Sequence, residues 1–220
     1  MTSESGEREG AGSFDIAALA WDKQGGLLPA VVQDAATLRV LMLGYMDRAA
    51  LEATLASGRV TFFSRSRQRA WTKGETSGHF LELESVQADC DGDTLLLLAR
   101  PQGPTCHRGT PSCFDGAPSD FLAELDALVA SREAQRPEGS YTTRLFEAGV
   151  RRIAQKVGEE GVETALAGVV QDDGALLGES ADLLFHLLVL MRARGLGLRD
   201  AVSVLRARHA VPTLHAAAEG

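Results

Sequence analysis

Five acidic residues in the second half of the chain have the spacing of a metal site. Glu159, Glu160 and Glu163 form an E-E-x-x-E pattern, and Glu179 and Asp182 form an E-x-x-D pattern, both within strongly helical sequence. Residues three or four apart share one face of a helix, where like charges destabilise an isolated helix by about 0.2–0.5 kcal/mol per pair. A divalent cation between the groups would offset this repulsion. The pattern therefore favours a divalent metal site over a solvated acidic face.

The three cysteines lie close together in the first half of the chain. They are Cys90, Cys106 and Cys113, and His107 follows the second directly. Three thiolates match the number of protein ligands in a catalytic zinc site, which keeps its fourth position for water. The spacing is not that of a C-x-x-C pair, and free cysteines are often buried as small apolar side chains. The residues alone leave both interpretations open.

Alternating carboxylates surround the first cysteine, and they are Asp89, Asp91 and Asp93. In an extended segment they would point to one side and Cys90 to the other, so oxygen and sulfur ligands could serve two different ions. A calcium EF-hand loop is excluded, because Thr94 and Arg100 stand where that loop needs glycine and glutamate. A polar hairpin turn at Asp91-Gly92 is the structural alternative.

A basic and hydroxyl-rich stretch precedes these metal candidates. The residues that we take as candidates for substrate binding are Ser64, Arg65, Arg67, Trp71, Lys73, Glu75, Thr76 and Ser77. Glycines at 74 and 78 expose backbone N–H groups beside them, as in a phosphate cradle. A solvated basic loop has the same composition, so this signal is weak by itself.

Short apolar runs separated by turn residues predict strands in the first half. The expected strands cover residues 27–32, 38–43, 60–63, 80–88 and 94–99. One helix is expected between them, with Asp47 as its N-cap and Gly58 as its end. This half therefore predicts an α+β domain.

Helical periodicity replaces the strand pattern after Phe114. Helices are expected from Phe121 to before Pro137, from about Leu145, over residues 177–194 and over residues 199–209. The second half therefore predicts an all-α bundle. Gly158 and Gly161 flank the acidic pair, which indicates either a broken helix or close packing against the backbone.

The change of pattern places a domain boundary near residue 116. We expect an N-terminal domain over residues 14–116 and a C-terminal domain over residues 117–220. Residues 1–13, rich in Ser, Glu and Gly, are expected to be disordered.

Composition limits the kind of function. The 220 residues carry a net charge of -8, which argues against general affinity for nucleic acid or an anionic membrane. No signal peptide is expected at the start, and no apolar run approaches the ~20 residues of a membrane span. An odd number of cysteines without a secretory signal does not fit a disulfide framework, so we expect a cytoplasmic protein.

Eight ordered motifs resemble two enzyme families. V-L-M-L-G-Y-M at 40, S-R-S-R at 64, W-x-K-G-E-T-S-G at 71, D-C-D-G-D-T-L-L at 89 and C-H-x-G-x-x-S-C-F at 106 resemble phosphoribosyl-AMP cyclohydrolase. S-Y-T-x-x-L-F, K-V-G-E-E-G-V-E-T and E-S-A-D-L-L-F-H-L-L are similar to phosphoribosyl-ATP pyrophosphatase, an all-helical relative of the nucleotide pyrophosphohydrolases. The order matches the fused bifunctional enzyme of histidine biosynthesis.

This resemblance implies substrates and metals that spacing alone does not. It implies phosphoribosyl-ATP and phosphoribosyl-AMP as substrates, and a homodimer. It implies Zn²⁺ at Cys90, Cys106 and Cys113, with ligands drawn from two subunits, and Mg²⁺ at Asp89, Asp91 and Asp93. A further Mg²⁺ site is expected at Glu159, Glu160, Glu163, Glu179 and Asp182. The chain departs from the cyclohydrolase pattern at Thr110-Pro111, usually two arginines, and at His79, usually asparagine.

Roles in catalysis follow as hypotheses. His107, next to a zinc ligand, is the candidate for proton transfer during ring opening, and Glu160 or Glu163 is the candidate base in pyrophosphate release. Lys156 either contacts a substrate phosphate or balances the acidic cluster. His186, on a largely apolar helix, is expected to be a core histidine.

Two other functions fit parts of the sequence. The acidic motifs alone also fit a house-cleaning nucleotide pyrophosphatase fused to another zinc hydrolase. A metal-stabilised binding module without activity is the second alternative, although it leaves the W-x-K-G-E-T-S-G motif unexplained.

Overall fold

The computed structural model describes residues 14–209, so the disorder expected for residues 1–13 lies outside the described part of the chain. The chain divides into two compact units after Asp120, four residues beyond the boundary that we expected. Each unit has its own hydrophobic core. The first unit contains all the strands among the described residues, and the second is helical.

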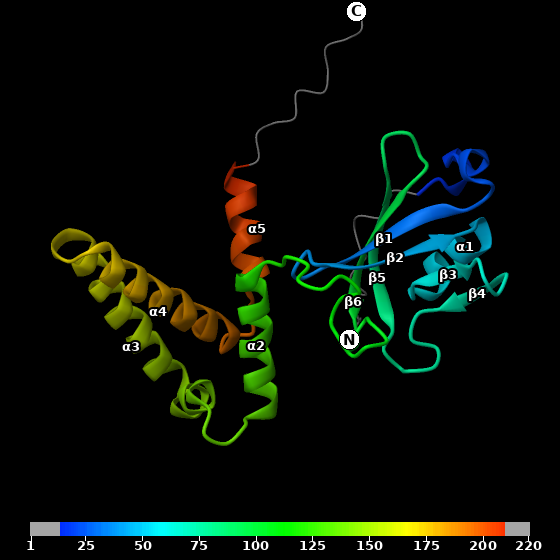
Figure 1. Ribbon diagram of the computed structural model, residues 1–220. Helices are drawn as coiled ribbons and strands as arrows, with labels where there is room; N and C mark the ends of the chain where they lie inside the picture. The colour runs from blue at the N-terminus through cyan, green and yellow to red at the C-terminus, as the bar shows by residue number, and fades with distance from the viewer. Residues whose placement is uncertain (1–13, 210–220) are drawn as a thin grey trace, which may run out of the picture. The chain divides into compact units, whose positions relative to one another are not determined.

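A four-stranded sheet forms the centre of the first unit (Figure 1). Its strands, in spatial order, are β2 (Val40–Met46), β1 (Leu28–Asp34), β6 (Leu95–Pro101) and β5 (Leu81–Ala88). β1 and β6 are parallel, and the outer pairs are antiparallel. Alternate residues of β1, namely Leu28, Ala30 and Val32, are fully buried, as expected for a sheet with one face in a core.

One helix and a small hairpin complete this unit. The elements are α1 (Arg48–Ser57), β3 (Thr61–Ser64), β4 (Arg69–Thr72) and the 3₁₀ turns η1 (Ile16–Ala18) and η2 (Trp21–Gln24). Helix α1 has the predicted ends, because the Asp47 side chain accepts a hydrogen bond from the Ala50 N–H and Gly58 adopts a left-handed conformation. β4 was not predicted, because its sequence R-A-W-T lacks an apolar run and its stability comes from pairing with β3.

The second unit contains four helices among the described residues. They are α2 (Phe121–Gln135), α3 (Tyr141–Val170), α4 (Asp173–Arg192) and α5 (Leu198–His209). α3 and α4 pack side by side (Figure 1). Val129, Ile153 and Val189 are buried at the centre of the small core. The predicted helical character is confirmed, although α4 begins earlier than expected, with the Asp172 side chain as its N-cap.

Helix α3 is interrupted at Gly149. This residue has φ 82° and ψ 169°, a conformation that is essentially restricted to glycine. The break separates the first turns of α3 from the segment that carries the acidic motif. Gly158 and Gly161, where we expected a break or a close contact, are helical, and only Gly161 lies near a neighbour, Leu183 of α4.

Helix α4 is long and apolar enough to cross a membrane by length and composition alone, although Glu179 and Asp182 interrupt its apolar residues. A core helix of a soluble protein passes the same test. The side chains of Glu179 and Asp182 on this helix lie beside the Glu160 carboxylate of α3. α4 therefore combines an acidic site with an apolar surface, where Leu177 is 70% exposed.

We predict that Gly149→Ala lowers the free energy of unfolding by about 1–3 kcal/mol, because a Cβ is strained in this conformation. Gly158→Ala is the matched control in the same helix, since Gly158 is helical and a Cβ added there would meet no neighbouring atom within 4 Å. The control should be stabilised by up to about 1 kcal/mol. Chemical denaturation measures both variants, and equal stability of the two would contradict this account of the break.

Candidate active sites

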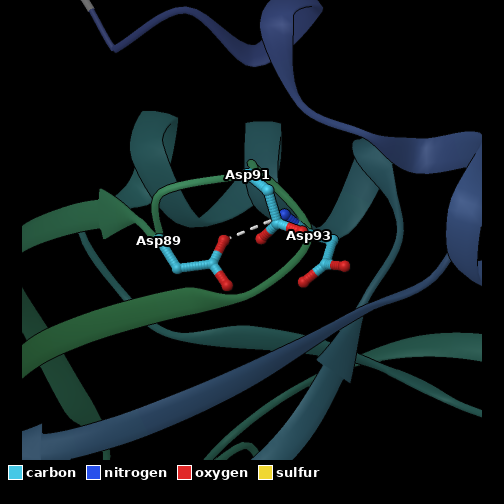
Figure 2. A group of neighbouring side chains, drawn as sticks. All are labelled: Asp89, Asp91 and Asp93. Atoms are coloured by element: carbon cyan, nitrogen blue, oxygen red, sulfur yellow. Dashed lines mark hydrogen bonds between the residues drawn. The ribbon is translucent and has the colours of Figure 1, made fainter.

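The turn between β5 and β6 brings three aspartates together (Figure 2). One oxygen from each of Asp89, Asp91 and Asp93 lies within 4.8 Å of the others. The turn is held in place because Gly92, at φ 72°, accepts a hydrogen bond from the Ala20 N–H through its carbonyl oxygen. The alternation seen in the sequence thus becomes an oxygen-rich group that could hold a divalent cation.

Local donors already contact these carboxylates. Asp89 Oδ1 accepts hydrogen bonds from the Asp93 N–H at 3.0 Å and the Thr94 N–H at 3.1 Å. Desolvation of the Asp89 carboxylate acts to raise its pKa. The two backbone donors outweigh this effect, so the pKa of Asp89 lies below its usual value. Lys23 Nζ lies 2.6 Å from Asp91 Oδ2 and 3.5 Å from Asp93 Oδ2, so one ammonium partly balances the group.

Two of the cysteines line a cavity of about 400 Å³. The loop that carries them follows β6 and is fixed to β2, because the Cys113 N–H donates to the Leu41 carbonyl and Ser112 Oγ donates to the Val40 carbonyl. The lining residues are Met42, Trp71, Lys73, Ser77, His79, Pro104, Thr105, Cys106, His107, Gly109 and Cys113. This cavity unites two thiols, the imidazoles of His79 and His107, and the Lys73 ammonium.

The two thiols of the cavity have different electrostatic surroundings. The Arg108 backbone N–H and then the Thr110 hydroxyl lower the pKa of the Cys106 thiol. Burial and the neighbouring Cys106 raise the pKa of the Cys113 thiol. His107 Nδ1 lies 3.9 Å from Cys106 Sγ. The pair therefore provides one thiol that favours the thiolate, the form that binds zinc.

Cys90 does not join the other two cysteines within one chain. It is exposed in the aspartate turn, and it is absent from the cavity lining. Within residues 14–209, the groups of three possible metal ligands with converging atoms are both purely acidic. A zinc site with all three sulfurs would therefore need a second copy of the chain.

The predicted substrate residues lie around two cavities, with exceptions. A second cavity of about 200 Å³ is lined by Arg67, Trp71, Thr72, Lys73, Gly74, Glu75, Thr76 and Ser77. Trp71, Lys73 and Ser77 line both cavities. Ser64 and Arg65 line neither, and the Arg65 guanidinium stacks 3.8 Å from the Tyr45 ring centre instead.

Glu75 has a structural contact within its own loop. Its Oε2 accepts a hydrogen bond from the Thr72 N–H at 3.1 Å, and its Oε1 lies 3.8 Å from Arg69. Met42 and Thr105 are cavity residues that the sequence analysis missed. Neither carries a sequence signal, because an apolar strand residue and a single threonine look like ordinary structural residues.

The helical unit gathers the second acidic group from two helices. Glu160 of α3 and Glu179 and Asp182 of α4 place one oxygen each within 4.8 Å of the others. Glu160 is only 5% exposed, although it is a carboxylate. The spacing predicted one site with five carboxylates, and the structure brings three of them together, which could hold a divalent cation.

The other two predicted acidic residues behave differently. Burial, followed by the charges of Glu160 and Glu179, raises the pKa of Glu163, and its carboxylate is not among the three that converge. Glu159 points to basic neighbours, with Oε2 3.0 Å from Lys156 Nζ and Oε1 3.4 Å from Arg152 Nη1. The structure therefore does not bring Glu159 into the converging group.

Lys156 balances the cluster. Its Nζ lies 2.6 Å from Glu160 Oε1, and this contact lowers the pKa of Glu160 and raises that of Lys156. Of the two roles considered for Lys156, the structure shows charge balance directly. His186 is buried, as expected of a core histidine, but its Nδ1 also lies 3.6 Å from Glu160 Oε1.

Two family models together match most of the chain. The phosphoribosyl-AMP cyclohydrolase model matches residues 42–115, and the phosphoribosyl-ATP pyrophosphohydrolase model matches residues 122–209. The first match contains both cavities and the aspartate turn, and the second contains the acidic group of α3 and α4. The fold and the sites thus define a two-domain hydrolase.

Curated relatives carry the same pair of domains. The chain is 68% identical over 93% of its length to the histidine biosynthesis bifunctional protein HisIE of Xanthomonas axonopodis pv. citri, covering 99% of that protein. It is 71% identical to HisIE of Xylella fastidiosa (strain Temecula1) over 87% of the chain and 93% of the relative. It is 56% identical to HisIE of Escherichia coli K12 over 87% of the chain and 95% of the relative.

The chain therefore belongs to the HisIE family of bifunctional enzymes of histidine biosynthesis. Its C-terminal domain is a phosphoribosyl-ATP pyrophosphohydrolase, which releases pyrophosphate and leaves phosphoribosyl-AMP. Its N-terminal domain is a phosphoribosyl-AMP cyclohydrolase, which opens the adenine ring between N1 and C6. The resemblance found in the sequence is confirmed.

We predict that Lys156→Met raises the pKa of Glu160, because the ammonium that favours its ionised form is lost. The pKa of Glu160 is depressed in the folded protein, so the stability it contributes is present above its unfolded pKa and is lost as the pH falls. The free energy of unfolding of Lys156→Met should therefore lack the part that Glu160 contributes above its unfolded pKa.

Carbon-detected NMR titration of the glutamate carboxyls without divalent ions measures this shift. Arg152→Met is the control, because it removes a neighbouring cation of α3 whose ion pair is with Glu159. An unchanged Glu160 pKa in Lys156→Met would show that the contact does not persist in solution.

Proposed function

We propose that the helical site binds Mg²⁺ through Glu160, Glu179 and Asp182. The observation that supports this assignment is the convergence of three oxygen atoms from two helices within 4.8 Å, although their charges repel. Oxygen ligands alone suit Mg²⁺, which usually binds through a few carboxylates, waters and substrate phosphates. Glu159, which turns to Lys156 and Arg152, has a supporting role in this proposal.

Pyrophosphate release needs a base and a substrate held in line. Mg²⁺ supplies charge neutralisation for the triphosphate when bound. Glu163 follows Glu160 by three residues on α3 and does not belong to the converging group, so we assign it as the base that takes a proton from the attacking water. The water oxygen bonds to the α-phosphorus, and the bond to the bridging oxygen of pyrophosphate breaks. Lys156 Nζ pairs with Glu160 Oε1, and it would be available to contact a phosphate once a cation binds Glu160.

The cysteine cavity is the proposed site of ring opening. Sulfur ligands select zinc, and Cys106 and Cys113 already lie in the same cavity, so the residues fit that ion. Cys90 is assigned as the third ligand, and Asp89, Asp91 and Asp93 as a separate Mg²⁺ site. When bound, zinc would lower the pKa of the water that it coordinates to about 7 and so provide hydroxide at neutral pH.

His107 and the neighbouring loop complete the ring-opening reaction. The water oxygen bonds to C6 of the purine, the C6–N1 bond breaks, and a proton passes to N1. His107, beside Cys106 in the cavity, is assigned to move that proton. Trp71, Lys73 and Ser77 are positioned to hold the base and a phosphate, together with Arg67 and Thr76 of the second cavity. Glu75 is assigned to shape this loop.

A homodimer would complete both domains. Cys90 lies outside the cavity of its own chain, so a second copy must supply the third sulfur if all three bind one ion. The helical unit also exposes apolar side chains on adjacent helices, and these are Val162, Leu166, Val169, Val170, Leu177, Leu184 and Leu187. A second copy that covers them would bury this surface. We expect the dimer to work in the cytoplasm.

We predict that single substitutions separate the two reactions. Cys106→Ala should reduce ring opening by more than about 100-fold, because even loss of an outer-shell partner costs about 10–100-fold, and should leave pyrophosphate release unchanged. Glu160→Ala should reduce pyrophosphate release and leave ring opening unchanged. Each reaction is assayed on the full-length chain, and each variant is the control for the other. Ring opening that survives in Cys106→Ala with full zinc content would refute the zinc assignment.

We further predict that two inactive variants restore ring opening when mixed. If each site uses Cys90 of one copy and Cys106 of the other, a heterodimer of Cys90→Ala and Cys106→Ala has one intact site. Random exchange of subunits should then give about a quarter of the wild-type rate.

The mixture is dissociated, reassociated and compared with each variant treated alone. A mixture of Cys106→Ala with Cys113→Ala is the matched control, because these two residues line one cavity of the same chain and cannot complement. Equal rates in the two mixtures would show that the sulfurs are not shared between copies.

A further inference from the structure

A buried imidazole lies between the two helices that carry the acidic group. His186 of α4 is only 4% exposed. Its Nδ1 lies 2.8 Å from the main-chain carbonyl oxygen of Asp182 and 3.6 Å from Glu160 Oε1 of α3. A single ring nitrogen thus faces two of the three converging acidic residues, one through its backbone and one through its side chain.

The partners of His186 determine which nitrogen carries the proton. A carbonyl oxygen can only accept a hydrogen bond, so Nδ1 must be the N–H that donates to Asp182. Nε2 of the neutral ring is then an acceptor. The Tyr141 hydroxyl lies 3.0 Å from Nε2 and is the donor that fits it. The tyrosine therefore holds the imidazole in the tautomer that presents an N–H to the acidic group.

Aromatic packing holds Tyr141 in place independently of its hydroxyl. The Tyr141 and Phe185 rings are stacked with centres 6.2 Å apart, and the Tyr141 and His186 rings meet edge to face at 6.0 Å. Tyr141 belongs to the short segment of α3 before the break at Gly149. Replacing tyrosine with phenylalanine would remove the hydroxyl and keep the packed ring.

We propose that Tyr141 and His186 are a positioning pair that holds Glu160 and Asp182 ready to bind a divalent cation. The inference rests on the proposed Mg²⁺ site of the helical unit. Lys156 Nζ lies 2.6 Å from Glu160 Oε1, and His186 Nδ1, whose N–H donates to the Asp182 carbonyl, lies 3.6 Å from the same oxygen. If the imidazole turns out of this position, Glu160 loses the polar ring edge beside it and can move away from its repelling neighbours, so the cation must reorder the site as it binds.

Calorimetric titration with Mg²⁺ in the absence of substrate tests the pair. All proteins are full-length and carry Asp91→Asn and Asp93→Asn, so that the helical site alone titrates. Outer partners of metal ligands contribute about 10–100-fold to metal affinity. Tyr141→Phe should therefore weaken Mg²⁺ binding by about 10-fold, and His186→Asn, which keeps a donor near Nδ1, by no more than about 100-fold.

A double variant tests whether the tyrosine acts through the histidine. If it does, adding Tyr141→Phe to His186→Asn should weaken Mg²⁺ binding by less than about twofold beyond His186→Asn alone. In steady-state assays, Tyr141→Phe should recover the parental kcat for pyrophosphate release at saturating Mg²⁺. Ring opening, measured in the chain with Asp91 and Asp93 intact, should be unaffected.

The outcomes separate this inference from the proposed site. No saturable Mg²⁺ binding in the parent overturns the metal site itself. Binding in the parent with equal affinity in Tyr141→Phe overturns the positioning pair, even if that variant melts at a lower temperature. Losses that add fully in the double variant overturn the claim that Tyr141 acts through His186.

Discussion

Repulsion among carboxylates gathered from two helices is the constraint on which the helical unit depends. Glu160, Glu179 and Asp182 approach within 4.8 Å, and Glu160 is nearly buried. Such a group raises the free energy of the folded state unless positive charge and hydrogen-bond donors lie beside it. Lys156 supplies the charge, and the side chains of α3 and α4 supply the packing that prevents separation. The small core around Ile153 and Val189 therefore serves to hold the acidic group in place.

In the first unit, turns and loops position the candidate metal ligands. Its ligands lie on the β5–β6 turn and on the loop after β6, where backbone hydrogen bonds from Ala20 and to Leu41 fix the chain. A rigid sheet with buried Leu95 and Leu97 anchors both segments. Because Cys106 and Cys113 lie on a different segment from the three aspartates, a soft cation at these thiols and a hard cation at the carboxylates need not compete for one site. The position of Cys90 leaves the sulfur set divided within a single chain.

The sequence was sufficient for what depends on local spacing. Asp47 and Gly58 predicted both ends of α1, and the acidic spacing predicted a group of five carboxylates, of which Glu160, Glu179 and Asp182 converge. Features that depend on tertiary contacts could not be predicted from the sequence. β4 needs β3 as its partner, and the break in α3 lies at Gly149 while the suspected glycines are helical.

Site membership was the least predictable property for the same reason. Glu159 shares the motif with Glu160, yet a rotation of about 100° around the helix directs it to Arg152 and Lys156. Arg65 belongs to a basic motif, yet it stacks on Tyr45. Met42 and Thr105 line the cavity without any distinctive pattern. Periodicity identifies the face of an element, whereas the neighbouring elements decide which side chains on that face meet.

The two proposed sets of metal ligands would also explain why one chain can carry both hydrolyses without mixing them. Attack at the α-phosphorus needs a cation that neutralises a triphosphate and exchanges with its oxygens, which favours an all-carboxylate site such as that of α3 and α4. Opening an adenine ring needs a strongly acidified water at neutral pH, which favours thiolates and an adjacent imidazole such as Cys106 and His107. A carboxylate trio binds zinc without the selectivity of sulfur, and a thiolate trio excludes magnesium. The chemistry of the proposed ligands therefore agrees with the reaction that the family models assign to each domain.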